Sequence, residues 1–322
     1  MSAAVEKSVA IVGGEQQPGA YSAALREFPE LRLDSVVGNA FGIESPNEAT
    51  PRYRDLEAML VERGAPDLAL VMTPPGQRCE QIQQILRAGV DVLAVPPLAT
   101  RAEDAESLVE FAERAGRELT TASPFRCSAG FNHARRLLRE DTIGELQYVE
   151  VNLEHKVDAR AGWRAEPERS GGGIWMQQGS CALDIAELLA GPLRRLRMVE
   201  IESQQNSSVE DRTVVETGHG GGVRARARIR LSWNGRSRRP LALCVGTRGE
   251  LAVGYSQLLL RIGDRLERHA PGHDPHDALV GSIREHLNRR CAAHPPLDQG
   301  PERLHWLEAG YRSVPGNRWV SA

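Results

Sequence analysis

Apolar residues in the first third of the chain recur in two alternating patterns. Short apolar runs with the length of buried strands occur at 9–12, 33–37, 67–72, 91–95 and 119–122. Between these runs, apolar residues recur at helical spacing at 21–28, 53–63, 77–88 and from Thr100, where Glu103 completes a capping box. Strands that alternate with helices predict a doubly wound parallel sheet, which we expect to end at Ser123 and Pro124.

The pattern changes beyond this boundary. After a helix at 131–140, alternation with a period of two predicts strands at 146–153, 196–202, 223–233, 241–245, 251–253 and 258–262. Helices at 277–289 and 301–312 and an edge strand at 318–320 complete the chain. The predicted fold class is α/β, with a parallel-sheet domain over 1–123 and an α+β domain with an open, mostly antiparallel sheet over 124–322.

The segment 170–192, SGGGIWMQQGSCALDIAELLAGP, predicts a buried helix that follows a glycine hinge. Gly191 and Pro192 end this helix, because glycine suits the position after a helix and proline cannot continue one. Gln177, Gln178 and Cys181 lie near its start, where glycines let another backbone approach, so they form a candidate wall of a site. The alternative interpretation is a core helix with two solvated glutamines.

Composition excludes several classes of protein. The 322 residues are too many for a single core, and a formal net charge of -3 argues against a nucleic-acid partner. No apolar run approaches the ~20 residues that span a bilayer, so we expect no membrane association. Glu6 and Lys7 interrupt the N-terminal apolar stretch, which predicts no signal peptide and a cytoplasmic protein.

Cysteine and histidine usage predicts no metal site. The five cysteines are widely scattered and form no CxxC pair, so neither a disulfide framework nor a structural zinc site is indicated. Several His and Asp residues crowd the proline- and glycine-rich stretch 269–277, but this stretch has the character of a loop, whereas metal ligands need rigid support.

Arginines alternate with apolar residues along the predicted strand 223–233. Arg224, Arg226, Arg228 and Arg230 therefore share one face of the strand. A solvated outer sheet face is the favoured interpretation, because long arginine side chains need no ligand there, and an anion site is the alternative.

The first strand runs into a glycine-rich turn and then a helix, an arrangement that places a pyrophosphate on backbone N–H groups. Gly13, Gly14 and Gly19 supply this turn, but Glu15 stands where a second glycine of the fingerprint belongs. Asn39 occupies the position of the acid that would bind the ribose of NAD, and it does not repel a 2′-phosphate. We therefore expect NAD or NADP as cofactor, with binding that is weak or lost.

Several motifs together resemble the Gfo/Idh/MocA family of glucose-fructose oxidoreductase and inositol dehydrogenase relatives. They are YRDL at 53–56, DLALVMTPPGQRCEQ at 67–81, DVLAVPPLA at 91–99, IGEL at 143–146, GWR at 162–164 and SGGGIWMQQGSCALD at 170–184. The resemblance implies a Rossmann domain facing a second domain with an open sheet, a sugar or cyclitol-like ligand between them, and a homo-oligomer. It also implies cofactor contacts from Thr73, Pro74 and Pro97 and substrate contacts from Trp163 and Arg164.

The resemblance further implies a catalytic Lys, Asp and His, and each is replaced in this chain. Pro96 stands at the Lys position, Gln177 at the Asp position and Cys181 at the His position. Proline and glutamine do not titrate, and a thiol with an ordinary pKa of about 8.5 accepts protons poorly at neutral pH. We also expect Pro96 and Pro97 to form a rigid corner, with Pro97 in the cis form that the family shows.

Another group could take over the proton transfer. The two lysines, Lys7 and Lys156, are poorly placed, whereas His155 lies on the apolar face of its strand and is the better replacement base. The alternative interpretation of His155 is a core histidine whose hydrogen bonds are satisfied within the fold. Three functions stay open: a divergent NAD(P)-dependent oxidoreductase that uses His155 or Cys181, a non-catalytic sensor, scaffold or partner subunit, and a lyase, isomerase or hydrolase on the same fold.

Overall fold

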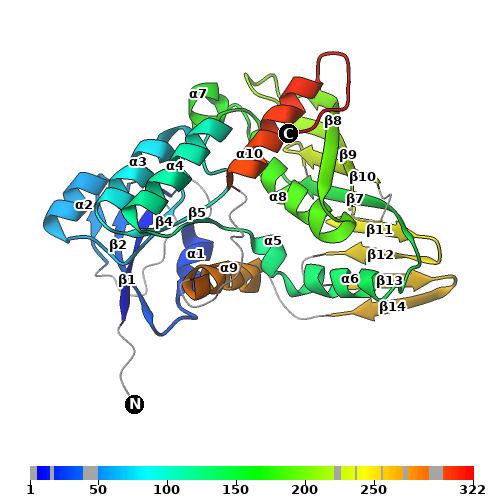
Figure 1. The fold of residues 1–322 in the computed structure, drawn as a ribbon, viewed down its shortest axis with the longest axis horizontal. Coiled ribbons are helices and arrows are strands. Elements are labelled where there is room, and N and C mark those ends of the chain that lie inside the picture. Colours follow the sequence, from blue (N-terminus) through cyan, green and yellow to red (C-terminus); the bar gives the residue numbers. More distant parts are fainter. Residues whose placement is uncertain are drawn as a thin grey trace. The chain divides into compact units, whose positions relative to one another are not determined.

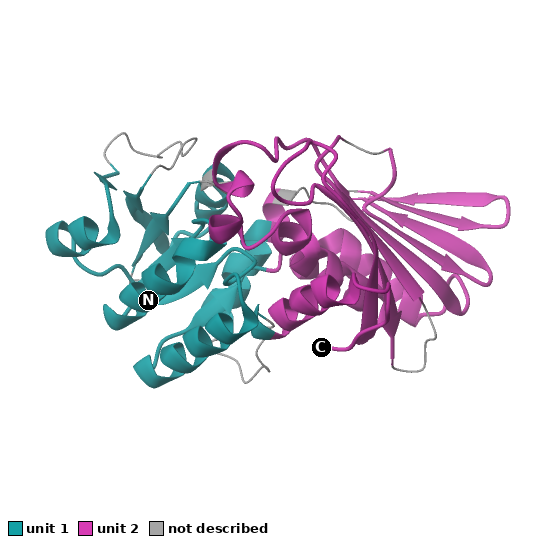
Figure 2. Ribbon diagram, turned by 90° about the horizontal axis from the view of Figure 1, so that it is seen from above, with its two compact units in different colours: residues 1–122, 279–301 teal, residues 123–278, 302–322 magenta. Residues whose placement is uncertain are grey.

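A computed structural model describes residues 6–14, 18–38, 50–220, 226–235, 238–254, 257–270, 275–289 and 300–322. The chain forms two compact units (Figure 2). Unit 1 comprises Met1–Ala122 and Leu279–Pro301, and unit 2 comprises Ser123–Ala278 and Glu302–Ala322. The segment 279–301, which the sequence-based division left in the second domain, belongs to unit 1 by its contacts.

Unit 1 is built on a parallel sheet, as predicted, with six strands where the sequence indicated five (Figure 1). Its strands, in the order β3-β2-β1-β4-β5-β6, are β1 (Lys7–Val12), β2 (Leu31–Val37), β3 (Arg52–Tyr53), β4 (Leu68–Val71), β5 (Asp91–Ala94) and β6 (Leu119–Thr121). The chain runs outward from β1 to β2 and β3, and then outward from β4 in the opposite direction. The strand order therefore reverses between β1 and β4, where open α/β sheets bind their ligands.

Helices cover both faces of this sheet. They are α1 (Pro18–Leu25), α2 (Leu56–Glu62), α3 (Pro75–Arg87), α4 (Ala102–Ala115) and α9 (Pro275–Arg289). Figure 1 shows α2, α3 and α4 together on one side and α1 and α9 on the other. Leu279, Val280 and Ile283 of α9 join the core formed by α1 and the central strands. The His286 Nδ1 atom lies 2.7 Å from the Thr120 hydroxyl, which ties α9 to β6.

The capping box predicted at Thr100 is wrong. Helix α4 begins one residue later, at Ala102, with Arg101 in the capping position and no side-chain hydrogen bond to the first turn. The Glu103 carboxylate instead accepts a 3.0 Å hydrogen bond from the Arg101 guanidinium. A local ion pair has therefore replaced the reciprocal cap that the sequence pattern indicated.

Unit 2 is built on an eight-stranded sheet with the order β14-β13-β12-β11-β7-β10-β9-β8. The strands are β7 (Leu146–Glu154), β8 (Leu193–Glu202), β9 (Arg212–His219), β10 (Arg226–Ser232), β11 (Ala242–Gly246), β12 (Gly249–Val253), β13 (Leu258–Ile262) and β14 (Arg265–His269). All neighbouring pairs are antiparallel except β7 with β10. The predicted mostly antiparallel sheet is confirmed.

One face of this sheet carries helix α8 (Ile174–Ala190), which packs against β7, β9 and β10. The other helices of unit 2 are α5 (Pro124–Cys127), α6 (Ala129–Arg139), α7 (Pro167–Ser170) and α10 (Gly300–Ser313), with a 3₁₀ turn at Gly162–Ala165. The Trp175 indole of α8 is fully buried and donates a 2.9 Å hydrogen bond to the Leu307 carbonyl of α10. Helix α8 is thus held between the sheet and α10.

The opposite face of the sheet is strongly charged. Arg228 lies opposite Glu150 of β7 and Glu216 of β9 in the strand register. The Arg230 guanidinium is 3.6 Å from the Glu150 carboxylate, and Arg197 of β8 binds Glu216 at 2.7 Å. Acidic side chains thus lie beside the arginines of β10, and Arg228 and Arg230 are half-buried rather than fully solvated; Arg224 lies outside the described residues.

Candidate functional site

A cavity of about 470 Å³ lies at the carboxyl ends of β1 and β2, beside the loop after β4. It lies at the end of β1, where the strand order reverses, and its lining includes Gly13, Thr73 and Gly38. Helices α2 and α3 complete the walls through Leu56, Glu57, Gln77, Gln81 and Gln84, among others. The place and the glycine-lined mouth suit a dinucleotide, since such folds bind ligands in the crevice at this switch point.

The predicted cofactor residues occupy different places in unit 1. Gly13 and Thr73 line the cavity, and Gly14 and Pro74 follow them directly in the chain. Gly19 lies within the first turn of α1. Asn39 and Glu15 lie outside the described residues.

Gly13 is fixed by its contact with Thr73. Its backbone has a φ of +84°, a left-handed conformation that side chains rarely adopt. A Cβ atom at this position would lie 2.5 Å from the Thr73 Cγ2 atom and 2.8 Å from its backbone nitrogen. The turn after β1 therefore touches the loop after β4 so closely that only glycine fits.

The loop after β5 contains a cis peptide bond between Pro96 and Pro97, as predicted. The side chain of Arg78, from α3, is fully buried beside this loop. Its guanidinium donates to the carbonyl oxygens of Val95 at 2.6 Å and Thr73 at 2.7 Å, and also to that of Pro97. Sequence reasoning missed Arg78. The available signal was its position one helical turn before Ile82, on the buried face of α3.

In unit 2, the first half of α8 carries a polar stripe composed of Gln177, Gln178 and Cys181, whose side chains are half-buried. The Gln177 amide donates a 2.9 Å hydrogen bond to the Ser170 carbonyl. The Gln178 amide nitrogen lies 3.2 Å from the His155 Nε2 atom, so the structure brings His155 to the edge of the stripe. The buried Gln178 Oε1 atom has no hydrogen-bond partner among the described residues.

The Cys181 thiol holds its proton tightly. Burial and, to a smaller degree, the negative charge of Asp184 raise the pKa of Cys181 to about 12. Asp184 follows three residues later on α8, so both side chains lie on the same side of the helix. At neutral pH the thiol is therefore uncharged, and it can bind by weak hydrogen bonds but cannot accept a proton.

Further along α8, beyond the stripe, two carboxylates bind two arginines. Asp184 accepts hydrogen bonds from Arg303 at 2.9 Å, from Arg126 at 3.2 Å and from the Ser123 hydroxyl at 2.9 Å. Glu187 binds the same two arginines and accepts a 2.8 Å hydrogen bond from the Leu193 N–H. The four side-chain charges cancel, so this cluster leaves no net charge under the stripe.

The N-terminus of α8 is held by a carboxylate that sequence reasoning also missed. Glu210 accepts hydrogen bonds from the Gly173 N–H at 3.0 Å, from the Trp175 N–H at 3.1 Å and from the Tyr311 hydroxyl at 2.7 Å. Burial raises the pKa of Glu210, and these donors counteract that shift. The Glu210 carboxylate thus satisfies two of the backbone donors that a helix leaves free at its start.

Trp163 and Arg164 lie on the 3₁₀ turn rather than on α8. Trp163 is 5% exposed, so it serves mainly as a core residue of unit 2. The Arg164 guanidinium lies 4.4 Å from the centre of the Trp163 ring, in a cation–π contact that leaves the ring face covered.

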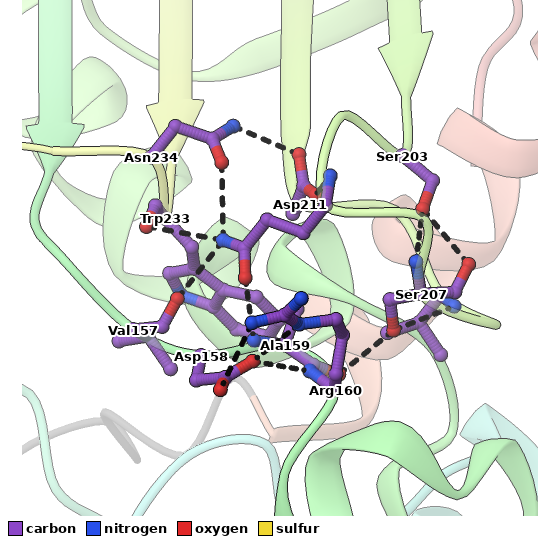
Figure 3. Close-up of polar contacts among 11 residues, drawn as sticks. Val157, Asp158, Ala159, Arg160, Ser203, Ser207, Asp211, Trp233 and Asn234 are labelled. Atoms are coloured by element: carbon purple, nitrogen blue, oxygen red, sulfur yellow. Dashed lines mark hydrogen bonds and ion pairs between the residues drawn. The ribbon is translucent and has the colours of Figure 1, made fainter.

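A polar network anchors the segment that leads from His155 toward this turn (Figure 3). The Gln205 amide accepts from the Ala159 N–H at 3.0 Å and donates to the Val157 carbonyl at 2.9 Å. Asp211 accepts from the Gln205 N–H at 2.6 Å and from the Asn234 amide at 2.9 Å. The loop after β7 is therefore bound to the β8–β9 connection and to the end of β10.

Among the described residues, no three His, Cys, Asp or Glu side chains gather as they would around a metal ion, and His273 and Asp274 lie outside this part of the chain. None of the described helices has the length and apolarity needed to cross a membrane.

Comparison with known proteins identifies relatives that match both the N-terminal and the C-terminal part of this chain. Residues 8–123 match an oxidoreductase family model with an NAD-binding Rossmann fold, and residues 131–252 match the GFO/IDH/MocA C-terminal domain. D-apiose dehydrogenase from Paraburkholderia graminis is 31% identical over 209 residues, which cover 64% of this chain and 52% of that protein. This chain thus spans about half the length of that curated relative.

Solved structures share the fold over nearly the full length. An aldose-aldose oxidoreductase from Caulobacter crescentus, complexed with glycerol, has a TM-score of 0.82 at 20% identity. The match covers 98% of this chain and 100% of the oxidoreductase. An inositol dehydrogenase homolog from Azotobacter vinelandii, complexed with NAD+, has a TM-score of 0.81 at 19% identity and covers 100% of this chain and 98% of that chain. Both halves of the chain therefore place it in the GFO/IDH/MocA family of oxidoreductases with an NAD-binding Rossmann fold.

Proposed function

We propose that this protein binds NAD or NADP in the unit 1 cavity and a neutral sugar- or cyclitol-like polyol at the polar stripe of α8, without the proton transfer usual in its family. The observation that carries the proposal is the polar stripe of α8 itself, in which Gln177 and Gln178 adjoin Cys181, whose raised pKa keeps its thiol neutral. Gln177, one helical turn before it, cannot titrate at all. The relatives named as sugar and inositol enzymes support the class of ligand.

The cofactor part of the proposal rests on the cavity. Gly13 leaves room for a close backbone approach, and Thr73 supplies a polar wall. The negative charge of Glu15 weakens pyrophosphate binding through repulsion, and Asn39 permits both NAD and NADP. We therefore propose binding in the high micromolar range, with little discrimination against the 2′-phosphate.

The polyol part rests on the charge of the stripe. Gln177 and Gln178 offer amide donors and acceptors, and Cys181 is neutral. The charges of Asp184 and Glu187 below it are balanced by Arg126 and Arg303. Such a surface favours uncharged hydroxyl-rich ligands over sugar acids or phosphates, whose charge would have no partner there.

One observation favours a second function, that of a divergent dehydrogenase. The His155 ring lies within 3.2 Å of the Gln178 amide, beside the stripe, and an imidazole is the side chain best suited to general base catalysis near neutral pH. In that case His155 would take the hydroxyl proton of the polyol while a hydride passes to the nicotinamide.

The partly exposed Leu243 and Val245 on the charged sheet face support the further proposal of a homo-oligomer.

Calorimetric titration tests the binding proposal. We expect NADH and NADPH to bind with similar high-micromolar affinities, and a polyol found by thermal-shift screening to bind independently of them. Gln177→Ala should lower the affinity for the polyol several-fold and leave the affinity for the dinucleotide unchanged. Gln147→Ala, at an exposed amide on β7, is the matched control and should change neither affinity. Absence of dinucleotide binding at millimolar concentration would contradict the proposal.

A further inference from the structure

Arg78 carries a permanent charge in a fully buried place. Its side chain has 0% exposure in unit 1, although a guanidinium cannot shed its proton to ease burial. Burial of a charge is unfavourable unless hydrogen bonds replace the lost water. The contacts of Arg78 therefore indicate which part of the fold depends on it.

Those contacts join two loops. The Arg78 Nε atom donates to the Thr73 carbonyl, just after β4, at 2.7 Å. Its Nη1 atom donates to the carbonyls of Val95 and Pro97, just after β5. Strands β4 and β5 are parallel neighbours, so both loops leave the same edge of the sheet. The planar fork of an arginine can reach all three carbonyls at once, which the single ammonium of a lysine cannot.

The first of these loops forms a wall of the cavity. Thr73 touches Gly13 so closely that an added Cβ would lie 2.5 Å from the Thr73 methyl group. The Thr73 hydroxyl also donates a 2.7 Å hydrogen bond to Gln81, another lining residue. A shift of Thr73 would therefore change the shape of the cavity at the end of β1.

We propose that Arg78 is a positioning residue for dinucleotide binding, which clamps the loops 73–75 and 95–97 into one rigid edge beside the cavity. It acts through Thr73 and does not touch the ligand, since its own side chain is enclosed by protein. The proposal rests on the proposed cofactor binding and adds the residue that fixes the geometry of that site.

The test compares Arg78→Lys with Leu86→Ala, which also removes buried contacts from α3 but lies away from the two loops. Binding of NADH is followed by nicotinamide fluorescence, and folding by circular dichroism. Arg78→Lys keeps the charge but not the fork, so we expect NADH affinity to fall about tenfold or more through misplacement of the wall. Leu86→Ala should lose thermal stability and keep the affinity of the wild type.

Chemical rescue separates positioning from general destabilisation. In Arg78→Ala, guanidinium ions at non-denaturing concentration should restore NADH affinity by occupying the vacated space, whereas they should not strengthen binding to Leu86→Ala. If the Arg78 variants do not fold, amide exchange of the wild type provides the measurement. NADH should then slow exchange in 72–78 and in 95–99 together, because the clamp makes the loops one unit.

The outcomes distinguish this proposal from the binding it depends on. Three results would overturn the clamp and leave the proposed function intact. They are wild-type NADH affinity in Arg78→Lys, an equal loss of NADH affinity in Leu86→Ala, and NADH protection from amide exchange that is confined to 72–78. A wild-type protein that binds no dinucleotide would overturn both.

Discussion

At the scale of single residues, burial determines which thiols can take part in chemistry. Burial raises the pKa of Cys244 and Cys181 to about 12 and that of Cys79 to about 11, well above the ordinary range of a thiol. Cys244 is completely enclosed in β11, so its shift comes from burial alone. A raised pKa in the folded state means that the unfolded chain releases its thiol proton first as the pH increases.

This difference predicts how stability depends on pH. The stabilising contribution of the protonated Cys244 thiol is complete below about pH 9 and is lost as the pH rises toward about 12, by up to about 1.4 kcal/mol per pH unit. Cys244→Ala should therefore flatten the fall in the free energy of unfolding above about pH 9, measured by urea denaturation at several pH values. The space that Cys244→Ala leaves in the core lowers the free energy of unfolding equally at all pH values. Parallel curves of this free energy against pH for variant and wild type would therefore refute the raised pKa of Cys244.

Single residues were predictable where their role is local. The φ requirement of Gly13 and the helical spacing of Gln177 and Cys181 follow from near neighbours in the sequence. Arg78 and Glu210 were missed because their partners are distant: Arg78 binds Val95 and Pro97, and Glu210 binds groups 35 to 101 positions away. No periodic pattern encodes contacts of that kind.

At the scale of elements, the glycine hinge before α8 makes a sharp prediction. Gly173 has an ordinary φ of −89°, but a Cβ atom there would lie 1.8 Å from the Glu210 carbonyl oxygen. Gly173→Ala should therefore destabilise the protein by about 3 kcal/mol or more through displacement of the α8 cap. Gly116→Ala is the control, since Gly116 has φ +63° and open space, and should cost only about 1–2 kcal/mol of left-handed strain. Similar losses of thermal stability in the two variants would contradict the close contact.

The sequence predicted most elements because their faces are clearly apolar, and it missed those whose faces are not. Strand β9 buries Thr213 and Thr217 in place of larger apolar residues, which hides its alternation. Strand β14 is the sheet edge and is largely exposed, so it shows no apolar side. The predicted helix at 53–63 begins later, at Leu56, because Arg52–Tyr53 pairs with β2 and Asp55 caps the helix.

At the scale of the whole molecule, the order of the chain does not follow its division into units. Helix α9 comes after the last strand of unit 2 but places Leu279, Val280 and Ile283 in the core of unit 1. Its amphipathic pattern predicted a helix correctly but could not specify which apolar surface the helix would cover. The two sheets, by contrast, were predictable, since βαβ alternation and period-two alternation differ along the sequence.

Hydride transfer by the wild-type protein decides between a binding protein and a working dehydrogenase. With NAD+ or NADP+ at saturating concentration, a panel of sugars and cyclitols should produce no rise in nicotinamide absorbance above background, although calorimetry detects binding of both ligands. The neutral Cys181 and the non-titrating Gln177 cannot take up the proton that oxidation of a hydroxyl group releases. A pH-dependent rise in absorbance that is abolished by His155→Ala or Cys181→Ser would contradict this account, because one of these groups would then be a working base.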